Sequence, residues 1–252
     1  GTCATVLVAA VSLPLSSLAL KFGPAEYFAV YFLAFSSFIG VGGAAPAKSL
    51  VSLCIGFAIA AMGMDTVSGT VRLTLGVDDF VRGISFVVAV MGLFGIGELL
   101  VAGEESLHAK GVASRIDWRV AWRTLLGMPR HWATLLRSAA VGCWMGITPG
   151  GPTAASFMSY GMAKRLSRRG ERFGTGEPEG IVAPETADHA AGTSALLPML
   201  ALGIPGSATA AVMMGGLMIW GLNPGPMLFI EQKDFVWGLI ASMYLGNLVA
   251  VV

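Results

Sequence analysis

The chain has 252 residues, of which 55% are hydrophobic and 12% are charged, and its mean hydropathy is +0.73. Soluble domains carry roughly 25% charged residues, so this chain has too few charges to cover a soluble fold of its length. The formal net charge of +1 gives no overall field for nucleic acid. The composition therefore predicts an all-α, polytopic membrane protein that lies in a lipid bilayer and binds no nucleic acid.

Eight apolar stretches are candidate membrane spans, at residues 2–20, 27–45, 47–64, 84–103, 138–163, 187–202, 205–221 and 235–252. A polar loop at 65–83 precedes the fourth stretch. The chain begins without Met and starts and stops inside apolar stretches, which predicts a fragment of a longer membrane protein. Within one transmembrane domain, 1–252, we expect N-terminal spans at 1–103, a cytoplasmic basic segment at 104–137 and a core at 138–252.

Positive charge is concentrated in two clusters in the middle of the chain. The first comprises Lys110, Arg115, Arg119, Arg123, Arg130 and Arg137, and the second comprises Lys164, Arg165, Arg168, Arg169 and Arg172. Basic residues near the ends of spans mark the cytoplasmic side, so both clusters are predicted to be cytoplasmic. The stretch 119–138, with Trp118, Trp122 and Trp132, suits a helix on the inner membrane surface; a cytoplasmic linker helix is the alternative.

The segment between the clusters, residues 138–163, must then leave and return on one side of the membrane. Two full crossings would need about 40 residues. Pro149, Gly150, Gly151 and Pro152 cannot continue a helix, so we expect a re-entrant hairpin with its tip there. The alternatives are that one cluster faces outward or that the segment is a single kinked span.

Two short segments of the core resemble each other: "GITPGGPTAAS" begins at Gly146 and "GIPGSATAAV" begins at Gly203. A broken helix in a membrane points its free N–H groups at a protein-lined cavity, the design by which transporters hold anions and coupling ions. The alternative is a pair of structural kinks. The predicted substrate-binding residues are Pro149, Gly150, Gly151, Thr153, Gly203, Pro205, Gly206, Ser207 and Thr209.

Acidic residues precede the second break. Pro184-Glu185-Thr186 is typical of a helix start, with Glu185 favouring the helix dipole. Asp188 and His189 enter the following apolar segment, where ionisable groups are costly and often functional. These three residues are candidates for ion coupling, with Na⁺ or H⁺ as the cation and no other cofactor; positions at the headgroup level are the alternative. No metal site is predicted with certainty.

The stretch from Gly146 to Phe229 resembles the large membrane subunit of the tripartite tricarboxylate transporters, the TctA family. The resemblance rests on ordered landmarks: Gly146–Gly150, Ser159-Tyr160, Phe173-Gly174-x-Gly176, Gly180, Ala183-Pro184-Glu185, Leu202–Gly206 and Pro224-Gly225-Pro226. Upstream, Leu18–Val30 and Gly83–Leu100 are also similar to the family.

This resemblance implies a multi-pass permease of the bacterial inner membrane, with a two-half transporter fold and no enzymatic activity. It would import tricarboxylates such as citrate, or related carboxylates, by ion-coupled symport, with a small membrane subunit and a periplasmic solute-binding protein. Family members usually carry Asn-Asn where this chain has Asp188-His189, and the family's N-terminal half is absent. An intramembrane enzyme and a channel or structural subunit are the competing hypotheses.

Overall fold

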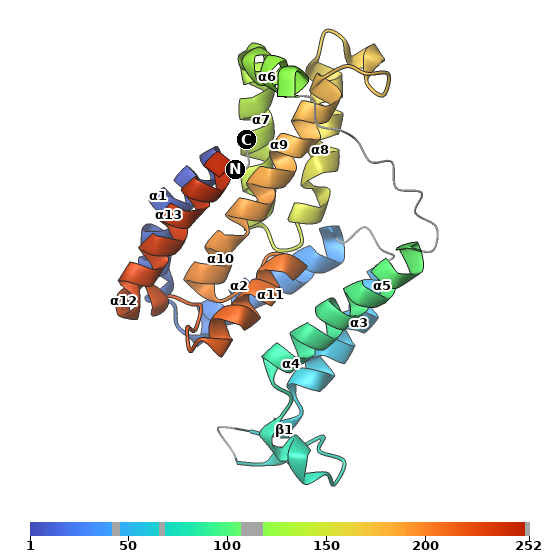
Figure 1. Cartoon of the computed structure of the whole chain (residues 1–252). Coiled ribbons are helices and arrows are strands. Elements are labelled where there is room, and N and C mark those ends of the chain that lie inside the picture. The colour runs from blue at the N-terminus through green and yellow to red at the C-terminus, as the bar shows by residue number, and fades with distance from the viewer. Residues whose placement is uncertain (42–45, 66–68, 107–117, 250–252) are drawn as a thin grey trace.

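The computed structural model describes residues 1–41, 46–65, 69–106 and 118–249, and helices dominate this part of the chain (Figure 1). The all-α prediction is confirmed. Within it, the helices Thr2–Ala19 and Phe86–Glu104 are long and apolar enough to cross a membrane, and Pro24–Ile39, Pro46–Ala60 and Ala208–Ile219 are shorter apolar helices. A polytopic arrangement of eight spans therefore stays a prediction. Lys110, Arg115 and the ends of two predicted spans, 42–45 and 250–252, lie outside the described residues.

The N-terminal part begins with α1 (Thr2–Ala19), α2 (Pro24–Val41) and α3 (Pro46–Ala60). Proline at the first helical position suits α2 and α3, since that residue needs no helical N–H bond. Glu26, in the first turn of α2, accepts a hydrogen bond from the Gly23 N–H at 2.8 Å, which satisfies one exposed helix-end donor. α2 packs against α3, where the rings of Phe35 and Phe57 meet edge to face at 4.9 Å.

A small antiparallel ribbon begins just before the predicted polar loop (65–83), and a short helix lies within the loop. β1 (Gly63–Met64) pairs with β2 (Val71–Arg72), and η1 (Asp78–Arg82) follows. The next apolar stretch forms α4 (Phe86–Val90), η2 (Met91–Ile96) and α5 (Gly97–Ser106). Because η2 is a π-helix, the stretch predicted as one regular span carries a widened turn in its middle. Its large side chains, such as Leu93 and Leu99, are exposed.

The basic segment forms two helices instead of one. α6 (Trp118–Gly127) is followed by η3 (Met128–His131), with Pro129 near its start, and then by α7 (Trp132–Ile147). The chain turns at residues 148–151 and returns as α8 (Pro152–Leu166). α7 and α8 are about 24 Å and 23 Å long. The chain thus reverses direction at the predicted tip, and the re-entrant course of this hairpin in a membrane stays a prediction.

The C-terminal part contains η4 (Gly170–Arg172), α9 (Glu179–Ser194), α10 (Leu196–Leu202), α11 (Ala208–Ile219), α12 (Leu228–Glu231) and α13 (Lys233–Val249). The helix start predicted at Pro184-Glu185 is wrong. α9 begins at Glu179 and Pro184 lies inside it, so Glu185 does not occupy a first turn. The break predicted at Gly203–Gly206 is present between α10 and α11.

Small residues allow α7 and α9 to approach closely. A Cβ added to Gly142 would lie 2.3 Å from the Ala187 carbonyl oxygen, and one added to Gly146 would lie 1.9 Å from Ser194 Oγ. Such glycine spacing brings helix backbones into contact. α8 joins the pair through a buried polar contact, in which Ser159 Oγ lies 2.8 Å from Ser138 Oγ and 2.9 Å from the Ala183 carbonyl oxygen.

A second core surrounds α10. α1 packs against α9, α10 and α13, so the first helix of the chain contacts the C-terminal helices. The Asn247 side-chain amide donates to Thr5 Oγ1 at 3.0 Å, which ties α13 to α1. The fully buried residues of this core are Val8, Leu197, Met199, Leu200, Ala201, Ala210, Leu228, Phe229, Val236 and Ile240.

Candidate functional site

The two Pro-Gly breaks predicted from the sequence touch each other. The Gly150 N–H, in the turn between α7 and α8, donates a hydrogen bond to the Gly206 carbonyl at 2.9 Å. A Cβ on Gly206 would lie 3.2 Å from the Gly146 carbonyl oxygen. Segments 56 residues apart in sequence therefore form one junction, which we call the Pro-Gly junction (146–151 and 203–207).

The first break depends on glycine at two successive positions. Gly150 has a φ of +79°, in the left-handed region. Gly151 has ordinary φ, but a Cβ there would lie 2.1 Å from the Met145 carbonyl oxygen. Pro152 then opens α8, whose N-terminus has no side-chain cap. The side chain of Thr153 lies outside the described residues, so its predicted contact with substrate stays a prediction.

The second break ends α10 and begins α11. Gly203 has a φ of +72° and terminates α10 in a left-handed turn. Pro205 follows, and Ser207 is the N-cap of α11, where its side chain accepts a hydrogen bond from the Ala210 N–H at 3.2 Å. Ser207 therefore stabilises the helix start. Thr209, the second residue of α11, is exposed.

Two neighbours of the junction were not among the predicted site residues. The Gly225 N–H, from the loop after α11, donates to the Leu200 carbonyl at 3.0 Å, and the Pro224 carbonyl oxygen lies 3.0 Å from a Cβ on Gly203. On the other side, a Cβ on Gly150 would lie 3.1 Å from the Phe38 ring. "NPGP" marks a break in sequence, but an apolar Phe38 in an apolar helix gives no local signal.

The three ion-coupling candidates lie on α9 and are separate from the glycines of the junction. Asp188 and His189 are exposed, as is Glu185. Ser156 Oγ lies 3.5 Å from Asp188 Oδ1 and 3.4 Å from the Pro184 carbonyl oxygen. Because Ser156 is in the second turn of α8, this contact brings Asp188 to the helix that starts at the first break.

A polar cluster occupies the other end of the α7–α8 hairpin, near α6 and η4 (Figure 1). Glu179 accepts a hydrogen bond from Thr134 at 2.7 Å, contacts the Ser167 hydroxyl and lies 3.9 Å from His131 Nδ1. The Ser167 hydrogen bond, aided by Thr134 and nearby positive charge, lowers the pKa of Glu179 despite some desolvation. Arg169 pairs with the buried Glu177 at 3.7 Å.

Comparisons with known proteins agree with the sequence landmarks. The model of the tripartite tricarboxylate transporter TctA family matches residues 1–252. An uncharacterised 52.8 kDa protein in the TAR-I ttuC' 3' region of Agrobacterium vitis is 35% identical over 254 residues, which cover 100% of this chain and 50% of that protein. A second uncharacterised protein of that organism, in the TAR-II ttuC' 3' region, is 41% identical over 112 residues, 44% of this chain and 46% of the relative.

The chain thus spans about half the length of the curated relatives it matches. No solved structure matches it. The family match covers every residue of the chain, including both breaks of the Pro-Gly junction and the preceding helices. The chain therefore belongs to the tripartite tricarboxylate transporter TctA family.

Proposed function

We propose that this chain is part of the permease subunit of an ion-coupled secondary transporter, which imports tricarboxylates or related carboxylates across the bacterial inner membrane. The small membrane subunit and the periplasmic solute-binding protein of a tripartite system would be its partners. The observation that carries the proposal is the hydrogen bond between Gly150 and Gly206, because it joins two broken helices at one place.

Physical chemistry supports an anion at this junction. α8 and α11 both begin there, and helix N-termini carry free N–H groups and a partial positive charge. Gly150, Gly151 and Gly206 let the segments of the junction pack closely, since a side chain at each would meet neighbouring protein atoms, and this packing brings the two helix starts together. A carboxylate can accept hydrogen bonds from such backbone donors without a metal or another cofactor.

Asp188 and His189 are the proposed coupling residues. Asp188 contacts Ser156 of α8, so a cation or proton at this carboxylate would affect the helix whose N-terminus faces the substrate. A carboxylate is a suitable oxygen ligand for Na⁺, and an adjacent imidazole can donate or accept a proton. The proposal does not depend on Glu185, which lies one turn earlier on α9.

Uptake of radiolabelled carboxylates tests this function. Cells would express the full-length permease with its partner subunits, and uptake of citrate, succinate and tartrate would be measured with and without Na⁺ at several pH values. We expect saturable uptake of at least one of these acids that depends on an ion gradient. Asp188→Asn/His189→Asn should change the ion dependence, with Glu185→Gln as the control. Unchanged ion dependence would remove Asp188 and His189 from the coupling step.

A further inference from the structure

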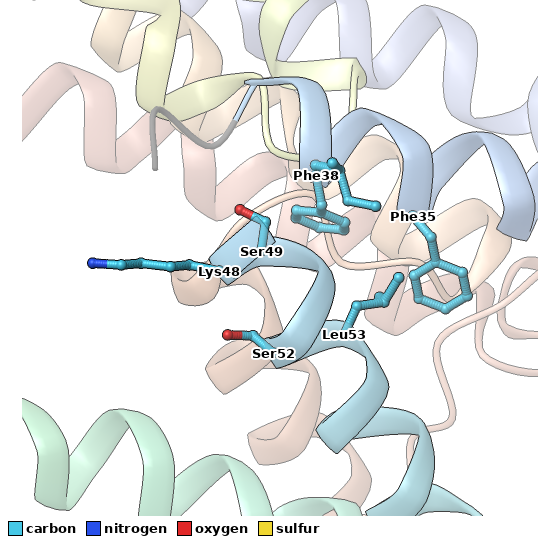
Figure 2. A pocket seen from close by; sticks show the side chains of 7 residues that line it. Phe35, Phe38, Lys48, Ser49, Ser52 and Leu53 are labelled. Atoms are coloured by element: carbon cyan, nitrogen blue, oxygen red, sulfur yellow. The ribbon is translucent and has the colours of Figure 1, made fainter. Parts of the chain in front are cut away.

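An open cleft between α2 and α3 contains a lysine next to two serines. The cleft has a volume of about 420 Å³, and its lining includes Phe35, Phe38, Lys48, Ser49 and Ser52. Figure 2 shows Lys48, Ser49 and Ser52 extending to one side of α3, while Phe35 and Phe38 of α2 lie on the other. One edge of the cleft is therefore polar and the opposite wall is aromatic.

The lysine is unusual for its position in the chain. Lys48 is the only Lys or Arg in α1, α2, α3, α4, η2, α5, α9, α10 and α11. Among the residues that the structure describes, no acidic side chain forms an ion pair with it. A charged group in an apolar helix is costly and is retained mainly where it has a function. Lys48 is exposed in the first turn of α3, and no ion pair within the described residues accounts for its charge.

The cleft adjoins the Pro-Gly junction through a shared side chain. Phe38 lines the cleft and also lies against Gly150, whose added Cβ would be 3.1 Å from its ring. The cleft and the turn that begins α8 are therefore neighbours on α2. The lysine side chain has a flexible four-carbon stem, which lets its ammonium group adjust to a ligand.

We propose that Lys48 binds a carboxylate group of the transported anion, and that the hydroxyls of Ser49 and Ser52 donate hydrogen bonds beside it. Lys48 and Ser52 are four residues apart, so they share one face of α3. An ammonium group offers three donors to a carboxylate, and such charge-assisted bonds are stronger than neutral ones. This inference rests on the proposed function and adds a cationic group to a site that otherwise consists of backbone donors.

The test compares initial uptake rates over a range of substrate concentrations in the full-length permease with its partner subunits. Lys48→Met is expected to raise the KM for the transported carboxylate by roughly tenfold or more, since it removes a hydrogen bond to a charged group. Lys48→Arg should keep most of the affinity. Lys21→Met is the matched control, because Lys21 is an exposed lysine that follows α1. Immunoblots of the membrane fraction measure the amount of each variant.

The outcomes distinguish a failure of the role of Lys48 from a failure of the proposed function. If wild-type permease shows saturable uptake and Lys48→Met has the same KM, the role of Lys48 is refuted while the proposed function stands. If the wild type takes up none of the carboxylates, the proposed function itself fails. Should Lys48→Met not reach the membrane, Ser49→Ala/Ser52→Ala leaves the charge in place; we expect a KM several-fold above wild type, and an unchanged KM would count against the site.

Discussion

At the scale of single residues, the structure separates side chains that organise the fold from those available to a ligand. Ser207 caps α11 and Ser159 links three helices, so both hydroxyls have structural partners. Asp188 is exposed, and its Oδ1 lies 3.5 Å from Ser156 Oγ. The hydroxyls of Ser207 and Ser159 therefore serve the fold. The exposed carboxyl group of Asp188 is the better candidate for binding a cation or a proton.

The hydrogen-bonded carboxylate of Glu179 should make the stability of the folded protein depend on pH in the acid range. Its pKa in the folded protein lies below its ordinary value of 4.5, chiefly because Ser167 donates a hydrogen bond to it. A lowered pKa adds stability that is fully present above about pH 4.5 and is lost as the pH falls through the folded pKa. Glu179→Gln should therefore flatten the decline of the thermal midpoint of the detergent-purified protein between pH 6 and pH 3.

Glu171→Gln is the control for this measurement, because Glu171 is an exposed acid in η4, close to the same end of the molecule. We expect it to follow the wild-type curve. If Glu179→Gln declines as steeply with acid as the wild type does, the hydrogen bond between Ser167 and Glu179 has no measurable effect on stability.

At the scale of helices, α7 and α9 pack so closely that there is no room for a side chain at Gly146. We predict that Gly146→Ala lowers the thermal midpoint by several degrees, since the new methyl group would overlap Ser194 Oγ and the Ala191 carbonyl oxygen. Samples in detergent are heated to a series of temperatures, and size-exclusion chromatography measures the folded protein that remains after each.

Gly192→Ala provides the matched control on α9, because a Cβ there meets no atom within 4 Å. Alanine has the higher helix propensity, so this variant should melt at or above the wild-type temperature. Equal midpoints for Gly146→Ala and Gly192→Ala would show that α7 and α9 are not in close contact in the protein.

The helix breaks could be predicted from sequence because their cause is local. Proline and glycine end helices wherever they stand together, and both predicted breaks are present. The same rule gives a wrong prediction at Pro184, where the sequence indicates a helix start. It lies inside α9, where burial of Ala183 and Ala187 against neighbouring helices outweighs the cost of an internal proline. The contacts of Gly150 with Gly206 and Phe38 depend on tertiary packing, so no local pattern indicates them.

At the scale of the whole molecule, the basic end and the polar loop lie far apart. In Figure 1, α6 and the end of α8 are at the opposite end of the molecule from β1. We predict that a cysteine replacing Arg168 reacts with a membrane-impermeant maleimide only after cells are permeabilised, because basic residues mark the cytoplasmic side. A cysteine replacing Leu75, an exposed residue of the polar loop, should react from outside spheroplasts.

The background for this labelling needs Cys3, Cys54 and Cys143 replaced by serine, since the described chain has these three free thiols. Uptake by the cysteine-free protein checks that it still folds. Labelling of the cysteine at position 168 from outside intact cells would contradict the arrangement in which the basic clusters are cytoplasmic and the α7–α8 hairpin is re-entrant.

The close packing of Gly142 and Gly146 against α9 also determines which parts of the molecule can move separately. Backbones in direct contact resist sliding because of steric overlap, so we expect α7, α8 and α9 to move together as one unit. α2 and α3 pack mainly against each other and reach the turn at Gly150 through Phe38. If the proposed permease alternates between inward and outward access, we expect the α2–α3 pair to move relative to these three helices and the contact between Phe38 and Gly150 to change.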